Sequence, residues 1–216
     1  MTHLIRKPPA ANPPLVRDLT TALAAALLFA WIATAALAAG IPAADFWIRD
    51  AVHSAASAPL TTLMRTVSNV GGGWFLCSFG VLIVIVLARI RRRREAAVFA
   101  IALAGANLLE EGMKLIFHRP RPEPFFGYDR PLTYSFPSGH AFVSLCFYLA
   151  LADVLVDPRW PPRRRLVAWS AAVLLILAIG ISRIYLGVHY PTDVAAGYAG
   201  AIAWTSVVRA VHPRWR

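Results

Sequence analysis

Two imidazoles and a carboxylate stand where they could share one reaction. His189 and Asp193 are four residues apart, and Pro191 lies between them, ahead of an apolar run. This pattern predicts the start of a helix, because proline is tolerated in the first turn and an aspartate is favoured at the positive end of the helix dipole. An imidazole held by a carboxylate, with Arg183 nearby, suits a nucleophile or base that acts on an anion. Charged groups between two apolar segments are costly unless they have a use.

A second group of such residues lies at 136–140, with the sequence Phe-Pro-Ser-Gly-His. Ser138 is a suitable helix N-cap, and Gly139 permits close approach of the backbone. The free N–H groups of a helix start bind anions, and His140 could reach the same anion. Taken alone, the segment is equally well explained as a capped helix with an interfacial histidine.

A third group is cationic. Lys114 and Arg121 are seven residues apart, and the loop that follows Lys114 is rich in proline. On their own they are better explained as two snorkelling cations at a membrane surface. Glu110 either positions Lys114 or is an interfacial carboxylate, and the second interpretation is favoured. Arg119 either adds to the binding of a phosphate or only decorates the loop.

The composition is that of an integral membrane protein. Of the 216 residues 58% are hydrophobic, the mean hydropathy is +0.56 and 15% are charged, against about 25% charged residues in a soluble domain. Cys77 and Cys146 lie inside apolar runs without a CxxC partner, so we expect two buried small hydrophobic side chains and neither a disulfide nor a metal site.

The net charge of +11 is explained by topology. Fifteen of the 22 basic residues form four clusters, each beside an apolar segment: Arg6, Lys7 and Arg17; Arg89 and Arg91–Arg94; Arg159 and Arg163–Arg165; Arg209, Arg214 and Arg216. Such clusters mark the cytoplasmic side of a membrane, which argues against a nucleic-acid partner. The other seven are expected on the outer side: Arg49, Arg65, Lys114, Arg119, Arg121, Arg130 and Arg183.

The fold class predicted is all-α, a bundle of six transmembrane helices with short interfacial helices on the outer side. The spans are expected at 18–39, 72–90, 95–116, 138–156, 166–184 and 192–211, because each apolar run is close to the length that crosses a bilayer. Residues 1–17 are a cytoplasmic lead without structure, 44–69 are interfacial helices, and 117–137 are an outer loop. Residues 18–216 form one domain. Cleavage after Ala38 is the rival for the first span, but its apolar run exceeds that of a signal peptide.

Several aromatic residues and histidines are left outside these groups. Tyr134, Tyr185 and Tyr190 have the character of membrane-boundary aromatics, with a pocket-lining role as the alternative. His3, His53 and His118 match no pattern and are predicted to be surface residues.

Together the three groups resemble the type 2 phosphatidic acid phosphatase family, whose motifs are shared with vanadium haloperoxidases. The family signature begins with a lysine that is followed after six residues by Arg-Pro, as in Lys114 and Arg121-Pro122. It continues with Pro-Ser-Gly-His, as in 137–140. It ends with Ser-Arg, five residues, His, three residues and Asp, as in 182–193. The signature covers about 80 residues, no position departs from it, and the six-helix layout extends the likeness.

The resemblance implies a metal-independent phosphatase without a cofactor. His189 would be the nucleophile and form a phosphohistidine, Asp193 would orient and stabilise its ring, and His140 would protonate the leaving oxygen and then activate water. The phosphoryl oxygens would be bound by a set of cations and helix-start donors, namely Lys114, Arg121, Ser138, Gly139 and Arg183.

The substrate that the resemblance implies is a lipid phosphate or diphosphate, of the undecaprenyl diphosphate, phosphatidate, phosphatidylglycerol phosphate or lipid A type. Polyprenyl diphosphate is favoured by analogy alone. The protein is expected in the bacterial inner membrane, with both termini in the cytoplasm and the site facing outward. The alternatives are a phosphotransferase, a haloperoxidase, or an anion-binding or transport protein without chemistry. The six expected spans argue against a haloperoxidase. A transporter is disfavoured because an anion-binding site does not require two histidines, and because the sequence has no internal repeat.

Overall fold

The computed structural model describes residues 13–37, 40–128 and 130–211. These residues form eight α-helices and no strand, in the order α1 Pro13–Leu37, α2 Ala43–Ser54, α3 Ala58–Val70, α4 Gly73–Arg89, α5 Arg93–Phe117, α6 Gly139–Leu155, α7 Pro162–Tyr185 and α8 Pro191–Val211. The prediction that residues 1–17 form a lead without structure is wrong for the last five of them, because α1 begins at Pro13. His3 lies outside the described residues.

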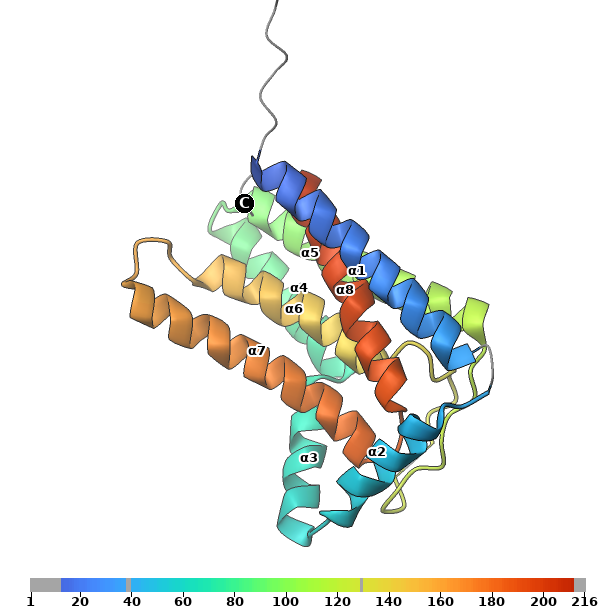
Figure 1. Ribbon diagram of the computed structural model, residues 1–216. Helices are drawn as coiled ribbons and strands as arrows, with labels where there is room; N and C mark the ends of the chain where they lie inside the picture. The colour runs from blue at the N-terminus through green and yellow to red at the C-terminus, as the bar shows by residue number, and fades with distance from the viewer. Residues whose placement is uncertain (1–12, 38–39, 129, 212–216) are drawn as a thin grey trace, which may run out of the picture.

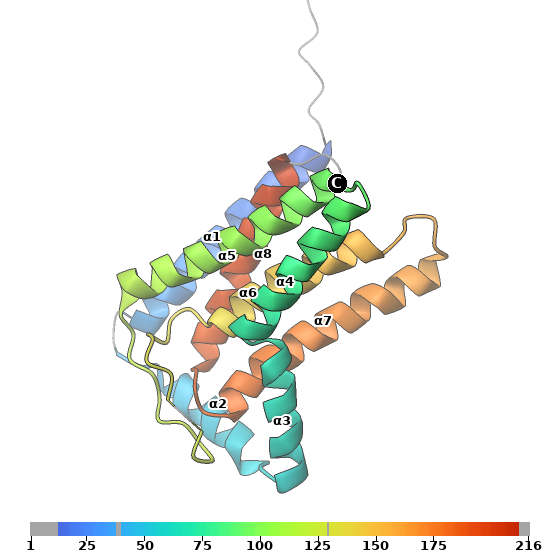
Figure 2. The same cartoon turned by 180° about the vertical axis from the view of Figure 1, so that it is seen from behind.

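Helix α6 is the centre of the bundle. It packs against α4, α5, α7 and α8, and α1 lies along the outer side of α8 (Figures 1 and 2). The core is built from apolar side chains of α5 and α6, among them Phe99, Phe142 and Phe147, which are fully buried. The short apolar helix α6 therefore buries its hydrophobic side chains against neighbouring helices. Helix α1 instead presents Leu23, Leu27 and other large apolar side chains outward.

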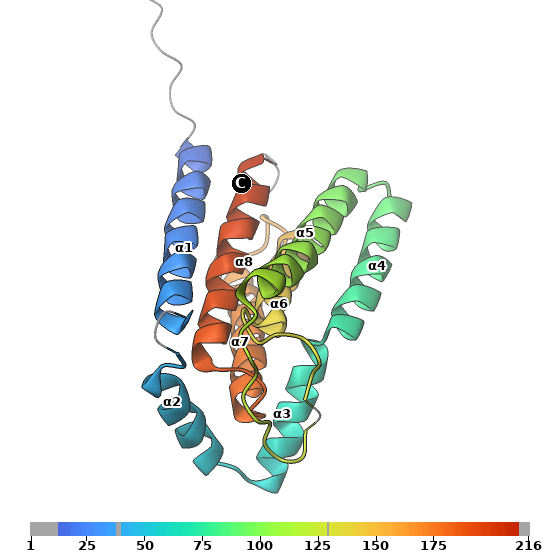
Figure 3. The ribbon, with the colours of Figure 1, turned by 90° about the vertical axis from the view of Figure 1, so that its right-hand side faces the viewer.

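The two ends of the bundle differ. Helices α2 and α3 and the segment 118–138 lie at one end, and the α4–α5 and α6–α7 connections lie at the other (Figure 3). The start of α1 and the end of α8 lie at the second end as well. The basic residues of the α4–α5 and α6–α7 connections therefore lie at the end of the bundle opposite to the segment 118–138.

The predicted all-α bundle is confirmed for the described residues, and several of its helices are candidate membrane spans. Four helices are long and apolar enough to cross a bilayer, namely α1, α5, α7 and α8. The pair α3 and α4 makes a fifth candidate with a bend of 43°, and α6 is a shorter apolar helix of 17 residues. Each predicted span coincides with a helix, but the count of six stays a prediction.

Helix α5 packs closely on α8 where Gly105 meets Trp204. A Cβ on Gly105 would lie 2.2 Å from the Trp204 ring, so only glycine fits there. The Trp204 indole N–H donates to the Ala102 carbonyl at 2.9 Å, which fixes the contact. Small residues at a helix crossing commonly serve this purpose in membrane proteins.

The prediction that Cys77 is buried is wrong, and α2 shows a related reversal of polar and apolar side chains. Cys77 is exposed, and on α2 the polar Asp45 and Arg49 are buried while Trp47 is 73% exposed. In lipid an apolar side chain gains little by turning inward, whereas a polar one must find a partner in the protein. Cys146 is buried, as predicted.

Tyr185 and His53 are not the membrane-boundary residue and the surface residue that the sequence predicted. Tyr185 is buried and its hydroxyl lies 2.7 Å from the Thr61 hydroxyl, so it is a packing residue between α7 and α3. His53 is half-buried and stacks on Phe125 with ring centroids 3.8 Å apart. His118 is exposed, as predicted.

Candidate active site

His189 lies in a short turn between α7 and α8. Gly187, with a φ of 75°, supplies the left-handed conformation that reverses the chain after α7. A Cβ at Gly187 would lie 2.7 Å from the Phe125 backbone nitrogen, so the turn is closely covered. As a result His189 is only 1% exposed, and α8 begins two residues later at Pro191, as predicted.

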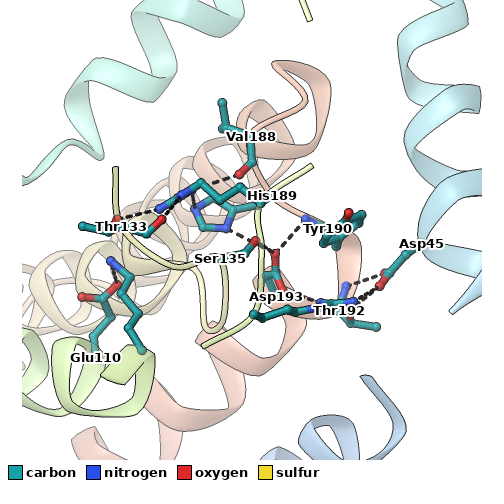
Figure 4. Close-up of polar contacts among 12 residues, drawn as sticks. Asp45, Glu110, Thr133, Ser135, Val188, His189, Tyr190, Thr192 and Asp193 are labelled. Atoms are coloured by element: carbon teal, nitrogen blue, oxygen red, sulfur yellow. Dashed lines mark hydrogen bonds and ion pairs between the residues drawn. The ribbon is translucent and has the colours of Figure 1, made fainter. Parts of the chain in front are cut away.

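The two ring nitrogens of His189 have opposite neighbours (Figure 4). Nδ1 lies 3.4 Å from Oδ2 of Asp193, and Nε2 lies 2.9 Å from Nη1 of Arg121. A carboxylate on one side and a guanidinium on the other favour the tautomer in which Nδ1 carries the proton and Nε2 keeps its lone pair. The lone pair therefore faces a cation, which is where an anionic group would bind.

Asp193 is fully buried in the first turn of α8 and accepts hydrogen bonds on both oxygens. Oδ2 accepts from the Tyr190 backbone N–H at 2.8 Å and from the Ser135 hydroxyl, and Oδ1 accepts from Arg119 at 2.5 Å. These donors, together with the helix dipole, stabilise the carboxylate form. These hydrogen bonds therefore fix the orientation of the Asp193 carboxylate toward His189.

Burial and charge keep His189 neutral. Desolvation, followed by the positive charges of Arg121, Arg183 and Lys114, holds the pKa of His189 well below its usual range. Burial, and then Arg183, lower the pKa of Arg121 to about 10, which leaves it a cation at neutral pH.

Arg121 is held rigidly in the segment after α5. Its Nε donates to the Thr133 carbonyl at 2.6 Å, Nη2 to the Thr133 hydroxyl at 2.9 Å, and Nη1 to the Val188 carbonyl at 3.0 Å. A guanidinium with three fixed contacts presents its remaining donors in one direction. Of these partners, Thr133 carries no signal in the sequence.

Two further predicted cations lie in the last turns of α7 and α5. Arg183, in the last turn of α7, is buried and donates to the Ser68 hydroxyl of α3. Lys114 lies 2.6 Å from Glu110 and 3.1 Å from Glu111. The favoured interpretation of Glu110 as an interfacial carboxylate is wrong, because its side chain is buried and pairs with Lys114.

Helix α6 begins where predicted, but without the predicted cap. Ser138 is the N-cap residue, yet its hydroxyl makes no hydrogen bond within the described residues. Its backbone N–H donates to the Asp193 carbonyl at 3.0 Å. A Cβ on Gly139 would lie 2.3 Å from Oε1 of Glu110, so the glycine places the start of α6 directly beside the Lys114 pair. His140 follows, half-buried, within electrostatic reach of His189 and the cations.

Arg119 has neither of its two predicted roles. It is buried, with Nη2 at 2.8 Å from Asp45 and Nη1 at 2.5 Å from Asp193, and its guanidinium lies 4.4 Å from the Tyr190 ring centroid. Tyr190 is accordingly a buried residue beside the site. Asp45 was missed entirely, since nothing in its local sequence connects it to Arg119.

All eight predicted site residues lie at the end of the bundle that also carries α2 and α3. Direct contacts join His189 to Arg121 and Asp193, and the Glu110 carboxylate joins Lys114 to the helix start at Gly139. Within residues 13–37, 40–128 and 130–211, no group of three or more His, Cys, Asp or Glu side chains is placed to hold a metal ion.

The comparison with known proteins identifies the family. A model described as the PAP2 superfamily matches residues 95–216, which is more than half of the chain. The chain belongs to the PAP2 superfamily. The resemblance drawn from the three motifs is therefore confirmed.

Relatives of this PAP2 protein act on phosphorylated lipids by name. It is 30% identical over 175 residues to phosphatidylglycerophosphatase B of Bacillus subtilis, covering 80% of this chain and 85% of the relative. It is 30% identical over 113 residues to the undecaprenyl-diphosphatase of Sulfolobus acidocaldarius, covering half of each. The crystal structure of a transmembrane PAP2 type phosphatidylglycerolphosphate phosphatase from Bacillus subtilis superposes with a TM-score of 0.80 at 26% identity, over 88% of this chain and 94% of that one. The prediction of an enzyme that acts on lipid phosphates agrees with these names.

Proposed function

We propose that this PAP2 protein is a metal-independent lipid phosphatase that works at the outer face of the membrane through a phosphohistidine at His189. The observation that carries the proposal is the placing of the His189 ring. Nδ1 faces the Asp193 carboxylate, and Nε2 faces the Arg121 guanidinium. A neutral imidazole so oriented is a nucleophile aimed at an anion.

In the first step Nε2 of His189 attacks phosphorus, and the bond from phosphorus to the leaving oxygen breaks. The ring becomes positive when the N–P bond forms, and the Asp193 carboxylate stabilises that charge through Nδ1–H. His140 gives its proton to the leaving oxygen, so the lipid alcohol or lipid phosphate departs without excess charge.

In the second step His140, now neutral, takes a proton from water, and the hydroxide oxygen attacks phosphorus. The N–P bond breaks, inorganic phosphate forms, and His189 returns to the neutral state. The same two histidines thus serve both steps with their roles on the leaving and entering oxygen reversed.

The negative charge on the phosphoryl oxygens is balanced by three cations from three elements, Lys114 of α5, Arg121 of the following segment and Arg183 of α7. The helix start at Gly139 and the Ser138 hydroxyl, which has no hydrogen-bond partner within the described residues, add donors. Charges fixed before the substrate binds stabilise a transition state most effectively.

The substrate class we propose is a lipid phosphate or diphosphate. The relatives are named for phosphatidylglycerol phosphate and for undecaprenyl diphosphate, and the residues around His189 recognise only the phosphoryl group. A panel of prenyl diphosphates, phosphatidate, phosphatidylglycerol phosphate and lipid A, each scored by phosphate release, ranks the lipids.

The mechanism is tested on the protein purified in detergent. Phosphate release should survive EDTA, His189→Ala should abolish it, and ³²P from labelled substrate should be trapped on the protein under alkaline quench. Loss of activity on chelation, or full activity of His189→Ala, contradicts the mechanism. Label that passes to an alcohol rather than to water indicates a phosphotransferase, and binding without turnover indicates an anion-binding protein.

The proposed topology has six spans, with the termini in the cytoplasm and the site outside. It is supported by the basic residues of the α4–α5 and α6–α7 connections, which lie at the end opposite to the segment 118–138. In a background without Cys77 and Cys146, a membrane-impermeant maleimide applied to intact cells should label Leu132→Cys but not Arg164→Cys; both positions are exposed. The reverse labelling would invert the topology.

A further inference from the structure

A buried carboxylate outside the three motifs contacts the catalytic region. Asp45 lies on α2, before the residues 95–216 that match the family, and is 1% exposed. Oδ1 accepts the Thr192 backbone N–H at 2.9 Å, and Oδ2 accepts the Thr192 hydroxyl at 2.6 Å and Nη2 of Arg119 at 2.8 Å. Asp45 is therefore bonded to the first turn of α8, the turn that carries Asp193 (Figure 4).

Arg119 links this carboxylate to the one beside the nucleophile. Its two terminal nitrogens diverge, with Nη2 on Asp45 and Nη1 on Asp193 at 2.5 Å. Nη1 also donates to the Thr192 hydroxyl at 2.8 Å. A planar fork that contacts two carboxylates at once fixes both, which a lysine ammonium does less well.

The charges along this chain matter for His189. Arg119 and Asp193 taken alone sum to zero, so a buried pair of this kind would leave little negative charge to stabilise a positive ring. With Asp45 the three groups sum to one negative charge. Because these groups are buried, the charge is weakly screened and acts on the neighbouring imidazole.

We infer that Asp45 is a positioning residue for catalysis, which holds Arg119 between two carboxylates so that Asp193 keeps its charge and its orientation toward His189. The inference rests on the proposed function of His189 as nucleophile. Asp45 touches no reacting atom and acts through Arg119.

A purely structural role for Asp45, as an anchor of α2 to α8, makes a different prediction. Loss of an anchor lowers the amount of folded protein but leaves each folded molecule unchanged. Loss of the proposed charge lowers turnover in molecules that are fully folded, because the positive phosphohistidine ring is less stabilised.

The test is Asp45→Asn in the full-length protein, with kcat and KM measured per folded molecule after size-exclusion chromatography. We expect kcat to fall roughly tenfold, the order of effect of one buried charge at an effective dielectric constant of about 20. KM, and the inhibition constant of inorganic phosphate, should change by less than about twofold, since the phosphate-binding cations are untouched. The control is Asp50→Asn, an exposed aspartate of the same helix, which should behave as wild type.

The dependence of kcat/KM on pH separates an electrostatic role of Asp45 from a purely anchoring one. The charged or titratable groups that act on His189 are Arg121, Arg183, Lys114, His140 and Asp193. Removing the negative charge of Asp45 takes one negative charge from the linked groups Asp45, Arg119 and Asp193, and so makes protonation of His189 less favourable. The acidic limb of kcat/KM should therefore move to lower pH in Asp45→Asn. A lower kcat with an unmoved limb would leave only the anchoring role and overturn the inference, as would an unchanged kcat.

If Asp45→Asn does not fold, Arg119→Lys tests the inference instead. Arg119→Lys keeps the charge but breaks the bridge, so kcat should fall about tenfold while KM holds; full turnover would overturn the inference. Failure of the proposed function is seen separately, as a wild-type protein whose turnover does not depend on His189.

Discussion

Replacing Gly139 by alanine tests the packing of the site at one atom. In a free helix the change would be favourable, since alanine exceeds glycine in helix propensity by about 1 kcal/mol. Here the new Cβ would lie 2.3 Å from Oε1 and 2.8 Å from Cδ of Glu110. The Gly139 backbone N–H is kept, so any loss of activity comes from the methyl group.

The size of the effect follows from those distances. To restore van der Waals separation the carboxylate must retreat by about 1 Å, but Glu110 is buried and paired with Lys114 at 2.6 Å. Overpacking of this kind costs about 1–3 kcal/mol of stability. A displacement of about 1 Å in a positioning group can cost up to a hundredfold in rate. We therefore expect a fall in kcat/KM of about ten- to a hundredfold, with a lower melting temperature.

The assay is phosphate release together with thermal unfolding in detergent. Gly112→Ala is the matched control on α5, because a Cβ there meets nothing within 4 Å; it should keep full activity and gain up to about 1 kcal/mol. Combining Gly139→Ala with Glu110→Asp shortens the carboxylate and should recover part of the loss. Wild-type kcat/KM and melting temperature in Gly139→Ala would refute the reasoning.

Two further predictions concern charge and packing. Because burial and then Arg121, Arg183 and Lys114 depress the pKa of His189, the acidic limb of kcat/KM that belongs to His189 should lie below pH 6.5. Arg183→Gln removes a positive charge and should move it to higher pH; an unmoved limb would contradict the assignment. Gly105→Val places a side chain where a Cβ is already 2.2 Å from Trp204, so it should lower the melting temperature, corresponding to about 1–3 kcal/mol, and leave kcat per folded molecule unchanged. Loss of kcat at unchanged melting temperature would contradict it.

The sequence was informative where a single physical rule dominates. Apolar length alone predicts the long helices to within a few residues, since crossing a bilayer requires about 20 apolar residues. The start of α8 follows from Pro191 and Asp193, because the helix dipole and proline geometry act locally. The convergence of Lys114 with His189 follows from topology, which places both on one end of the bundle.

The sequence was uninformative where partners are far apart along the chain. Asp45 bonds Arg119 across 74 residues, and Ser68 accepts from Arg183 across 115. Neither acceptor lies in a motif, and both occur on short helices whose apolar side chains suggested a surface position. The Ser135 hydroxyl that donates to Asp193 is likewise one serine among several in its loop.

These misses share a cause that bears on how the site is built. A cluster of cations and carboxylates beside hydrocarbon must draw its partners from the protein, since lipid supplies none. The residues 95–216 that match the family carry all the proposed reacting and phosphate-binding groups, whereas Asp45 and Ser68 come from the helices before them. Helix α2 therefore turns Asp45 toward Arg119 and leaves Trp47 outside, and α3 turns Ser68 toward Arg183. A hydropathy pattern interpreted by the rule for soluble proteins would place Asp45 at the surface and Trp47 inside, and it is therefore misleading for α2, at the place where the site needs its support.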